Sequence, residues 1–202
     1  MGRPKLKSEA VATTERLLLA AEEEFAAHGF EGARLSDIAA KVGISRPSLL
    51  YHFESKEALY AAVVKTAFLR LGEALAFATD GRERFETKLL AAVRHFVEFI
   101  EERPALAKLV LREIIDARGI GRSIVVDGGV PVLEQMERFI QREGHGRVSS
   151  AVPLRAALMS IVSSVMVRAS AGPLRKPLWG EGDETPLLAQ ALFLGTLEEV
   201  RC

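Results

Sequence analysis

Apolar residues recur at intervals of three and four positions along almost the whole chain of 202 residues. In the first strong segment, about residues 13–28, Leu17, Ala21 and Phe25 lie one turn apart and would form one face of an amphipathic helix. No stretch shows the clear alternation of apolar and polar residues that a half-buried strand has. The sequence therefore predicts an all-α protein.

Capping residues and helix breakers divide this pattern into about nine helices. After residues 13–28, the expected helices cover about 35–42, 45–53, 55–78, 85–100, 104–114, 131–144, 150–171 and 186–200. Two stretches rich in Gly and Pro, residues 119–129 and 172–184, are expected as loops.

Residues 35–56 hold two short helices joined by the tight turn Gly43-Ile44-Ser45, which is the plan of a helix-turn-helix. Ser45 can cap the second helix, and Pro47 falls in its first turn, where a missing N–H costs nothing. Six apolar residues can lock this pair onto the first helix: Ile38, Ala39, Val42, Ile44, Leu49 and Phe53. On this pattern alone, a helical hairpin that only packs is the alternative.

A different set would face outward from the second helix: Arg46, Pro47, Ser48, Tyr51 and His52. Arg46 lies near the helix N-terminus, where its guanidinium can pair with guanine O6 and N7 in a major groove. Pro47 offers an apolar surface to a thymine methyl group, and Ser48 can bond a base or a phosphate. Lys56 and the free N–H groups at the start of the next helix would form a further phosphate site.

The positive charge of this segment is local. Lys and Arg equal Asp and Glu at 27 each, so the chain has a formal net charge of zero and is not a general polyanion binder. Between residues 32 and 56, four cations face two anions, a balance of +2: Arg34, Lys41, Arg46 and Lys56 against Asp37 and Glu54.

A longer string of residues carries a family resemblance. It consists of Phe25, His28-Gly29-Phe30, Asp37-Ile38-Ala39, Val42-Gly43-Ile44-Ser45, Leu49, His52-Phe53, Ser55-Lys56-Glu57 and Leu59. With this spacing, residues 13–63 closely resemble the DNA-binding domain of the TetR family of repressors. The resemblance implies a ligand-responsive transcriptional regulator, a repressor that binds palindromic operator DNA as a homodimer and is released by a small-molecule effector.

The resemblance also implies roles by position. Family positions that contact phosphates or bases hold Ser36, Ser45, Arg46, Pro47, Ser48, Tyr51, His52 and Lys56. Two positions depart from the family pattern. Leu50 stands where the family often has Tyr, which puts the usual Tyr–phosphate contact in doubt. Arg34 replaces a small hydroxyl residue and can add a phosphate contact.

We therefore expect a helix-turn-helix DNA-binding domain in residues 1–56 and a helical regulatory and dimerisation domain in residues 57–202. The start of the chain, residues 2–7, carries a charge of +3 and can act as a basic arm in a narrow minor groove. A disordered solubilising tail is the alternative.

Beyond about residue 79 the chain resembles the family only in layout. The family's last two long helices pair with those of a second subunit, and the corresponding helices here carry stripes of small, uncharged residues. We expect these at the dimer interface, with burial inside one chain as the alternative: Ala156, Ser160, Ser163, Ser164, Val167, Leu188, Ala191, Leu192, Gly195 and Leu197.

The family's ligand pocket would lie between the fourth and eighth helices. Six candidate lining residues are Phe68, Phe96, Phe99, Met136, Phe139 and Met159, for which the plain core is the alternative. They imply a largely apolar effector. Control by a protein partner, and activation instead of repression, are the alternative functions.

Other function classes lack support in the sequence. His95 and His145 have no metal-ligand spacing, and no phosphate loop or nucleophile–base arrangement occurs, so we expect no enzyme, cofactor or metal. The single cysteine, Cys202, can form no internal disulfide. Because no apolar run suits a membrane helix and the start lacks the apolar stretch of a signal peptide, a cytoplasmic protein with no membrane partner is expected.

Overall fold

The computed structural model describes residues 3–116 and 121–195, with side chains from residue 11 onward. Within these ranges it contains ten α-helices, one short 3₁₀ helix and no strand. The prediction of an all-α fold that begins with a helix-turn-helix is confirmed.

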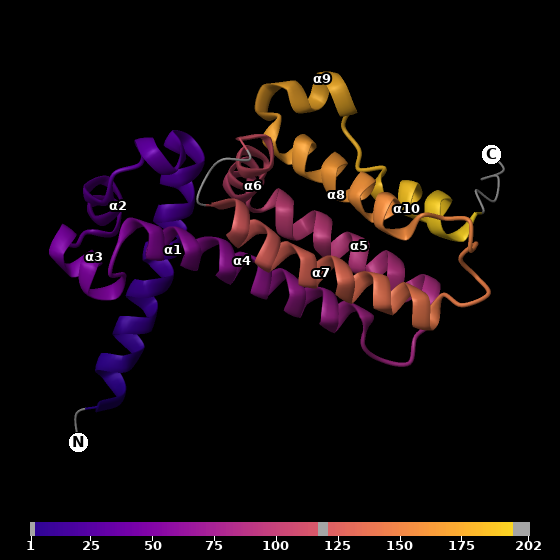
Figure 1. Cartoon of the computed structure of the whole chain (residues 1–202), viewed down its shortest axis with the longest axis horizontal. Helices are drawn as coiled ribbons and strands as arrows, with labels where there is room; N and C mark the ends of the chain where they lie inside the picture. Colours follow the sequence, from indigo (N-terminus) through magenta and orange to yellow (C-terminus); the bar gives the residue numbers. More distant parts are fainter. Residues whose placement is uncertain (1–2, 117–120, 196–202) are drawn as a thin grey trace.

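Three helices form one end of the molecule: α1 (Arg3–Gly32), α2 (Leu35–Val42) and α3 (Arg46–His52) (Figure 1). The expected first helix was too short, because α1 begins at Arg3 and residues 3–7 have a helical backbone. Gly29, the expected stop, is non-helical with φ 72° and marks a kink inside α1.

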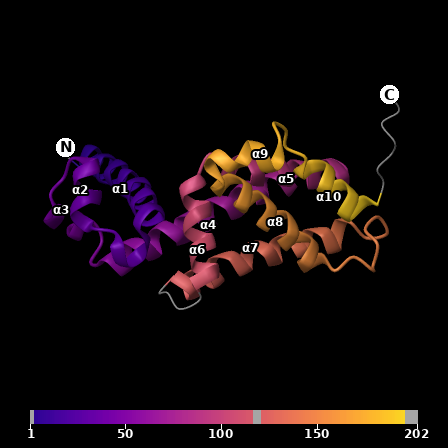
Figure 2. The same ribbon diagram turned by 90° about the horizontal axis from the view of Figure 1, so that it is seen from above.

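The long helix α4 (Lys56–Thr79) leaves this end and runs into the rest of the molecule. It packs there against α5 (Phe85–Glu101) and α7 (Gly121–Glu143), which run alongside it in Figures 1 and 2. α6 (Pro104–Asp116) contacts both α1 and α8 (Leu154–Ser170), and therefore lies between the two ends of the molecule. The last helix, α10 (Thr185–Leu194), packs on α5 and α8.

The beginning of α7 corrects a sequence prediction. Residues 121–129 were expected as loop, and a helix was expected to start at Pro131, but α7 already starts at Gly121 and contains Pro131. Gly128 has a packing role, since a Cβ there would lie 2.5 Å from Cδ2 of Phe68. The glycine lets α7 approach the Phe68 ring on α4, and this tertiary contact outweighs the weak helix propensity of the segment.

Three further boundaries differ from the sequence predictions. The eighth helix starts at Leu154, after a turn, rather than at Ser149 or Ser150. The expected loop 172–184 contains the 3₁₀ helix η1 (Gly172–Leu174) and the short helix α9 (Arg175–Trp179). α10 ends at Leu194, because Gly195 adopts a left-handed conformation with φ 66°. The rest of the expected last helix, including Leu197, and Cys202 lie outside the described residues.

The segment between α8 and α10 is held by ion pairs around Arg168, a buried residue of α8. Arg168 pairs with Asp183 and, through Nη2, with Oε1 of Glu101 at 2.9 Å. Arg175 of α9 contacts the same Glu101 oxygen at 2.8 Å. These contacts tie α9 and the following turn to the end of α5.

Within the described residues, no single helix has the length and apolar composition to span a membrane. Among the described residues, only α8 taken together with residues 172–179 has the length and composition of a membrane-spanning segment. The two parts meet at a bend of 114°.

Candidate nucleic-acid interface

The turn between α2 and α3 is built as the sequence predicts. Gly43 ends α2 in a left-handed conformation, with φ 78°. Ser45 caps α3 by accepting a hydrogen bond from the backbone N–H of Ser48 at 3.2 Å. Ile38 and Leu49 are fully buried where the two helices meet α1. This local chemistry fixes the direction in which α3 presents its outer face.

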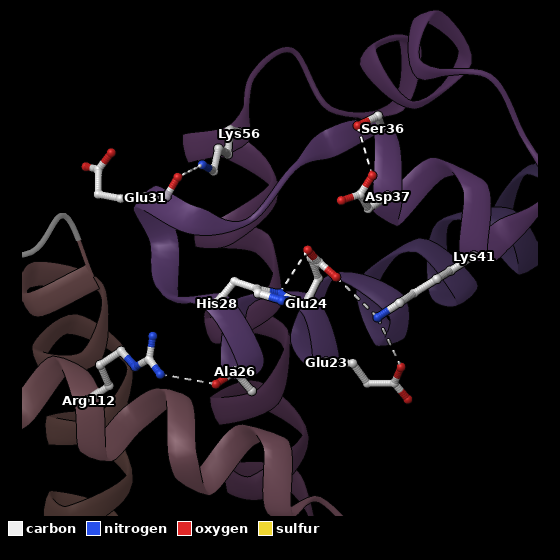
Figure 3. Close-up of polar contacts among 10 residues, drawn as sticks. All are labelled: Glu23, Glu24, Ala26, His28, Glu31, Ser36, Asp37, Lys41, Lys56 and Arg112. Atoms are coloured by element: carbon white, nitrogen blue, oxygen red, sulfur yellow. Dashed lines mark hydrogen bonds and ion pairs between the residues drawn. The ribbon is translucent and has the colours of Figure 1, made fainter.

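Polar contacts also hold α2 against α1. Arg16 donates to the carbonyl of Val42 at 2.6 Å, which satisfies a free carbonyl at the end of α2. Lys41 pairs with the buried Glu24 at 3.3 Å and with Glu23 at 3.7 Å (Figure 3). Lys41 is therefore neutralised by α1, although the sequence counted it among the local cations.

The outer face of α3 is exposed. Arg46, Pro47, Ser48 and Tyr51 all lie on the surface, and the Tyr51 side chain is 89% accessible. A shallow groove beside this face brings together residues from α2, α3 and the start of α4. It is lined by Arg34, Leu35, Ser36, Arg46, Leu50, Ser55 and Lys56.

Two guanidinium groups border this groove. Arg34 occupies the position before α2, and Arg46 is the first residue of α3. Both side chains are exposed, and neither has a hydrogen bond or ion pair to another residue that the structure describes. Ser36 also lies on the surface and donates to Asp37 at 3.1 Å (Figure 3).

Lys56, which also lines the groove, is held in place by two contacts. Its Nζ donates to the carbonyl of Glu31 at 3.1 Å and lies 4.9 Å from the centre of the Phe30 ring. Figure 3 shows the Lys56–Glu31 contact. Because an ammonium has three N–H groups, Lys56 keeps further donors for a phosphate.

The N-terminus of α4 is already partly satisfied. Ser55 accepts a hydrogen bond from the N–H of Ala58 at 3.0 Å. The pKa of Glu57 lies below its usual value because its carboxylate bonds its own backbone N–H and Ser55. Fewer free N–H groups remain there for a phosphate than the sequence suggested.

His52 does not face outward as the sequence indicated. It is half-buried, and its Nδ1 lies 3.3 Å from Oγ1 of Thr14 on α1. Sequence reasoning also assigned no contact to Leu50, which lines the groove together with the two arginines. Its place directly after Leu49 in the recognition segment could have indicated that Leu50 lies at this surface.

The stripes on α8 and α10 are largely exposed. On α8 the exposed positions are Ala156, Ser160, Ser163 and Val167. On α10 they are Leu188 and Ala191, and Gly195, which follows α10, is also exposed. Ser164 and Leu192 are half-buried. A hollow between the two helices is lined in part by Ser164, Leu188 and Ala191. Leu187, 55% exposed, adds an apolar side chain that the sequence prediction omitted.

A cavity of about 240 Å³ lies among α4, α5, α6, α7, α8 and α10. Five of the six predicted lining residues form its wall: Phe68, Phe96, Phe99, Met136 and Met159. Phe139 is not in the wall; its ring packs against Phe85 with centroids 5.5 Å apart. The α7 residues Val125, Val126 and Val130 also line the cavity. The sequence missed them because this part of α7 was expected as loop.

A buried polar pair joins α4 to α6 next to the helix-turn-helix. Tyr60 of α4 donates to Oε1 of Glu113 on α6 at 2.5 Å. The Tyr60 ring also packs edge-on against Phe25 and Phe30 of α1, with centroids 4.9 and 5.3 Å apart. Burial, and then the hydrogen bond to Glu113, raise the pKa of Tyr60 well above its usual value.

Two further side chains, Arg103 just before α6 and Arg112 within it, contact α1. Arg112 of α6 donates to the carbonyl of Ala26 on α1 at 3.4 Å (Figure 3). Arg103 pairs with the buried Glu22 at 2.5 Å. The pKa of Glu22 is raised because burial outweighs the attraction of Arg103. Among the described residues, no group of three or more His, Cys, Asp or Glu could hold a metal ion.

Comparison with known proteins gives the same assignment for the N-terminal part. Residues 17–63 match the model of the family described as bacterial regulatory proteins, tetR family. The uncharacterised HTH-type transcriptional regulator YdgC of Bacillus subtilis is 34% identical over 108 residues, 52% of this chain and 55% of that protein. The HTH-type transcriptional activator FasR of Mycolicibacterium smegmatis is 41% identical over 90 residues, 43% of this chain and 39% of FasR. The aligned part thus spans about half the length of these relatives or less.

A solved structure extends the likeness to the whole fold. The fatty acid degradation regulator FadR of Bacillus halodurans superposes with a TM-score of 0.76, covering 92% of this chain and 96% of the FadR chain. The two sequences are 17% identical, so this likeness establishes the fold alone.

Proposed function

The chain belongs to the TetR family of bacterial regulatory proteins, and on that premise we propose that it is a ligand-responsive transcriptional repressor. In this proposal, residues 1–56 bind palindromic operator DNA and residues 57–202 form the regulatory and dimerisation domain. A small-molecule effector releases the homodimer from its operator. The protein acts in the cytoplasm, where its DNA lies.

The observation that carries the proposal is the groove bordered by Arg34 and Arg46. Both guanidiniums are exposed and without a partner in the described part of the chain. Lys41, by contrast, is neutralised by Glu23 and Glu24 and adds no free charge to this face. Two unpaired guanidiniums beside one groove, with Arg46 at the start of α3 and Arg34 before α2, suit guanine edges and phosphates.

Some residues of this surface would contact the bases of the operator, and others would position the protein on its phosphate backbone. Arg46 and Pro47 lie at the N-terminal end of α3, the part that reaches base edges in helix-turn-helix proteins. Arg34, Ser36 and Lys56 line the same groove and would contact a phosphate strand. Ser45 caps α3, and His52 contacts Thr14, so these two residues orient the recognition helix.

Dimerisation follows from the size of the reading surface. α3 has only seven residues and reads too few bases by itself. Two-fold partners place two recognition helices about 34 Å apart, one turn of DNA. The exposed small residues of α8 and α10 provide a surface on which two helices from each subunit can approach closely.

Ligand control is supported by the course of α4. Its first residue, Lys56, lies in the groove, and Ala67, Phe68, Leu71 and Leu75 line the cavity. A ligand that binds more tightly to one setting of α4 than to another would change the spacing of the recognition helices. The apolar cavity favours a small-molecule effector over a protein partner.

Activation is the second candidate function, because the relative FasR is described as an activator. Both functions share the same DNA-binding step, so a promoter–reporter assay separates them. Deleting the gene raises transcription of a target promoter for a repressor and lowers it for an activator.

The DNA-binding step is tested by selecting duplexes from a randomised library with the full chain. We expect enrichment of inverted repeats whose half-site centres lie about one helical turn, or a multiple of it, apart. Sedimentation should show a protein dimer on one selected duplex. Recovery of no sequence above the unselected pool would contradict the proposal.

A further inference from the structure

The wall of the 240 Å³ cavity is apolar throughout. Its residues are Ala, Val, Leu, Ile, Met, Phe and one Gly, and none carries a charge or a polar side chain. The helices α4 to α8 supply nearly all of them, with Phe193 added by α10. Because the wall lies within helices, its backbone groups are largely engaged in helical hydrogen bonds.

The buried polar pair between α4 and α6 does not open into this wall. Tyr60 and Glu113 are absent from the lining, and they bond each other at 2.5 Å. An ionised ligand group inside the cavity would therefore lose its hydration without gaining a partner. That loss is large for a charge, so the wall selects against charged ligands.

The cavity is elongated along the helix axes. The wall residues of α4 extend from Ala67 to Leu75, which is about 12 Å of helix. On the neighbouring α5 they extend from Leu89 to Ile100, about 16 Å. A volume of 240 Å³ distributed over about 12 Å has a mean cross-section of about 20 Å². A cavity that is narrow relative to its length suits a chain-like molecule better than a compact one.

Two wall residues reach the surface. Ile114 at the end of α6 is 54% exposed, and Val126 in the first half of α7 is 49% exposed. Both also line the cavity, so they mark its mouth. A polar end group that a ligand carries would have to lie here, in contact with water.

We propose that this cavity binds an uncharged, elongated apolar molecule that lies parallel to α4 and α5 and enters between Ile114 and Val126. The inference rests on the proposed function and specifies the class of effector. Its size range is set by the volume, since an apolar cavity of about 150 Å³ accommodates benzene.

Calorimetry on the full chain without DNA tests the class with three probes of similar carbon content. Octanol is a neutral chain, octanoate is the same chain with a charge, and adamantanol is neutral but compact. We expect saturable binding of octanol, one per subunit, and at least about tenfold weaker binding of octanoate because its charge must stay hydrated. Adamantanol should also bind at least about tenfold more weakly, because close-packed walls reject a wider shape.

Each probe can overturn one part of the proposal. Octanoate binding as tightly as octanol would refute the uncharged class, and adamantanol binding as tightly would refute the elongated shape. Failure of all three to bind a folded protein would refute the assignment of the cavity. Such a failure leaves operator binding, measured separately on selected duplexes, untouched.

A matched pair of variants locates the binding. Ala67 lies in the wall, whereas Ala76 lies on the exposed side of the same helix. Ala67→Leu fills part of the cavity and should weaken octanol binding at least about tenfold, while Ala76→Leu should leave it unchanged. Thermal unfolding checks that both variants fold, and Ala92→Leu on α5 gives a second wall variant. Unchanged octanol binding in both folded wall variants would place the ligand elsewhere.

Ligand control is then tested with the same probe. Saturating octanol should lower the affinity of the wild type for a selected duplex but leave that of Ala67→Leu unaffected. If octanol binds in the cavity without changing DNA affinity, the ligand class stands and the proposed control by this cavity is refuted.

Discussion

Tyr60 and Glu113 form a buried hydrogen bond of 2.5 Å that joins α4 to α6. The second carboxylate oxygen of Glu113 is buried and has no hydrogen-bond partner among the described residues. Gly121, the first residue of α7, lies directly against the pair. The contact thus joins three helices at the place where the cavity-bearing part of the chain meets the helix-turn-helix.

Tyr60→Phe keeps the aromatic ring and its packing. It removes the hydroxyl group that donates a hydrogen bond to Glu113. A buried acceptor left without its donor loses about 1–3 kcal/mol, so we expect the free energy of unfolding to fall by that amount. Urea denaturation measures it. Tyr51→Phe is the matched control, because Tyr51 is exposed and its change should stay within about 0.5 kcal/mol. Equal stability of the two variants would show that the buried bond contributes nothing.

Gly43→Ala tests the turn of the helix-turn-helix. Gly43 has φ 78°, and an added Cβ would meet nothing within 4 Å, so the cost is confined to the backbone. A left-handed conformation costs an L-residue about 1–2 kcal/mol, and we expect that loss in unfolding free energy. Gly182→Ala is the control, since Gly182 also has open space but lacks a positive φ. A loss no greater than the control's would contradict the strained turn.

The helix-turn-helix could be predicted from sequence because local residues determine it. Gly43 ends α2, Ser45 caps α3 and Ser55 caps α4, each within a few residues of the boundary it sets. The outward face of α3 followed from the same periodicity. The contact of His52 with Thr14 did not, because it depends on how α3 is seated on α1.

The regulatory part was less predictable because distant contacts decide its structure. Gly128 and Pro131 weaken a helix locally, yet α7 continues through both where it packs on Phe68 and α4. The cavity wall was predicted in part, since Phe68 and Phe96 lie on apolar faces that any core would use. The exclusion of Phe139 depends on its packing with Phe85, which no local pattern contains.

Asp183 provides a test through pH. Burial by itself raises its pKa, but the hydrogen bonds from Arg168 and Thr185 outweigh burial and hold the pKa below the usual 3.8. A lowered folded-state pKa gives stability that is present above 3.8 and is lost as the pH falls through the folded value.

Asp183→Ala should therefore destabilise the protein at neutral pH and do so less at about pH 3. Urea unfolding of both proteins at the two pH values measures the difference. Asp80→Ala, at an exposed position, controls for general effects of charge. A cost that stays constant down to low pH would mean that the Arg168 contact does not depend on the ionised carboxylate.

Ser163→Arg tests the proposed dimer surface. Ser163 is exposed on α8 in a stripe of small residues, and a long charged side chain there would keep two helices apart. We expect sedimentation equilibrium to shift from dimer to monomer. Ser150→Arg adds the same charge at an exposed position before α8 and should remain dimeric. If Ser163→Arg is as dimeric as Ser150→Arg, the subunits associate through another face.

The most direct test of DNA recognition by α3 is the affinity of Arg46→Ala for a selected operator duplex. Arg46 is the first residue of α3 and is exposed beside the groove. Arg94→Ala serves as control, because Arg94 is exposed on α5 in the regulatory part. We predict that Arg46→Ala loses about 1–3 kcal/mol of specific binding and relaxes selectivity at one base of each half-site, while Arg94→Ala binds as the wild type does. Wild-type affinity and selectivity in Arg46→Ala would contradict the assignment of α3 as the recognition helix.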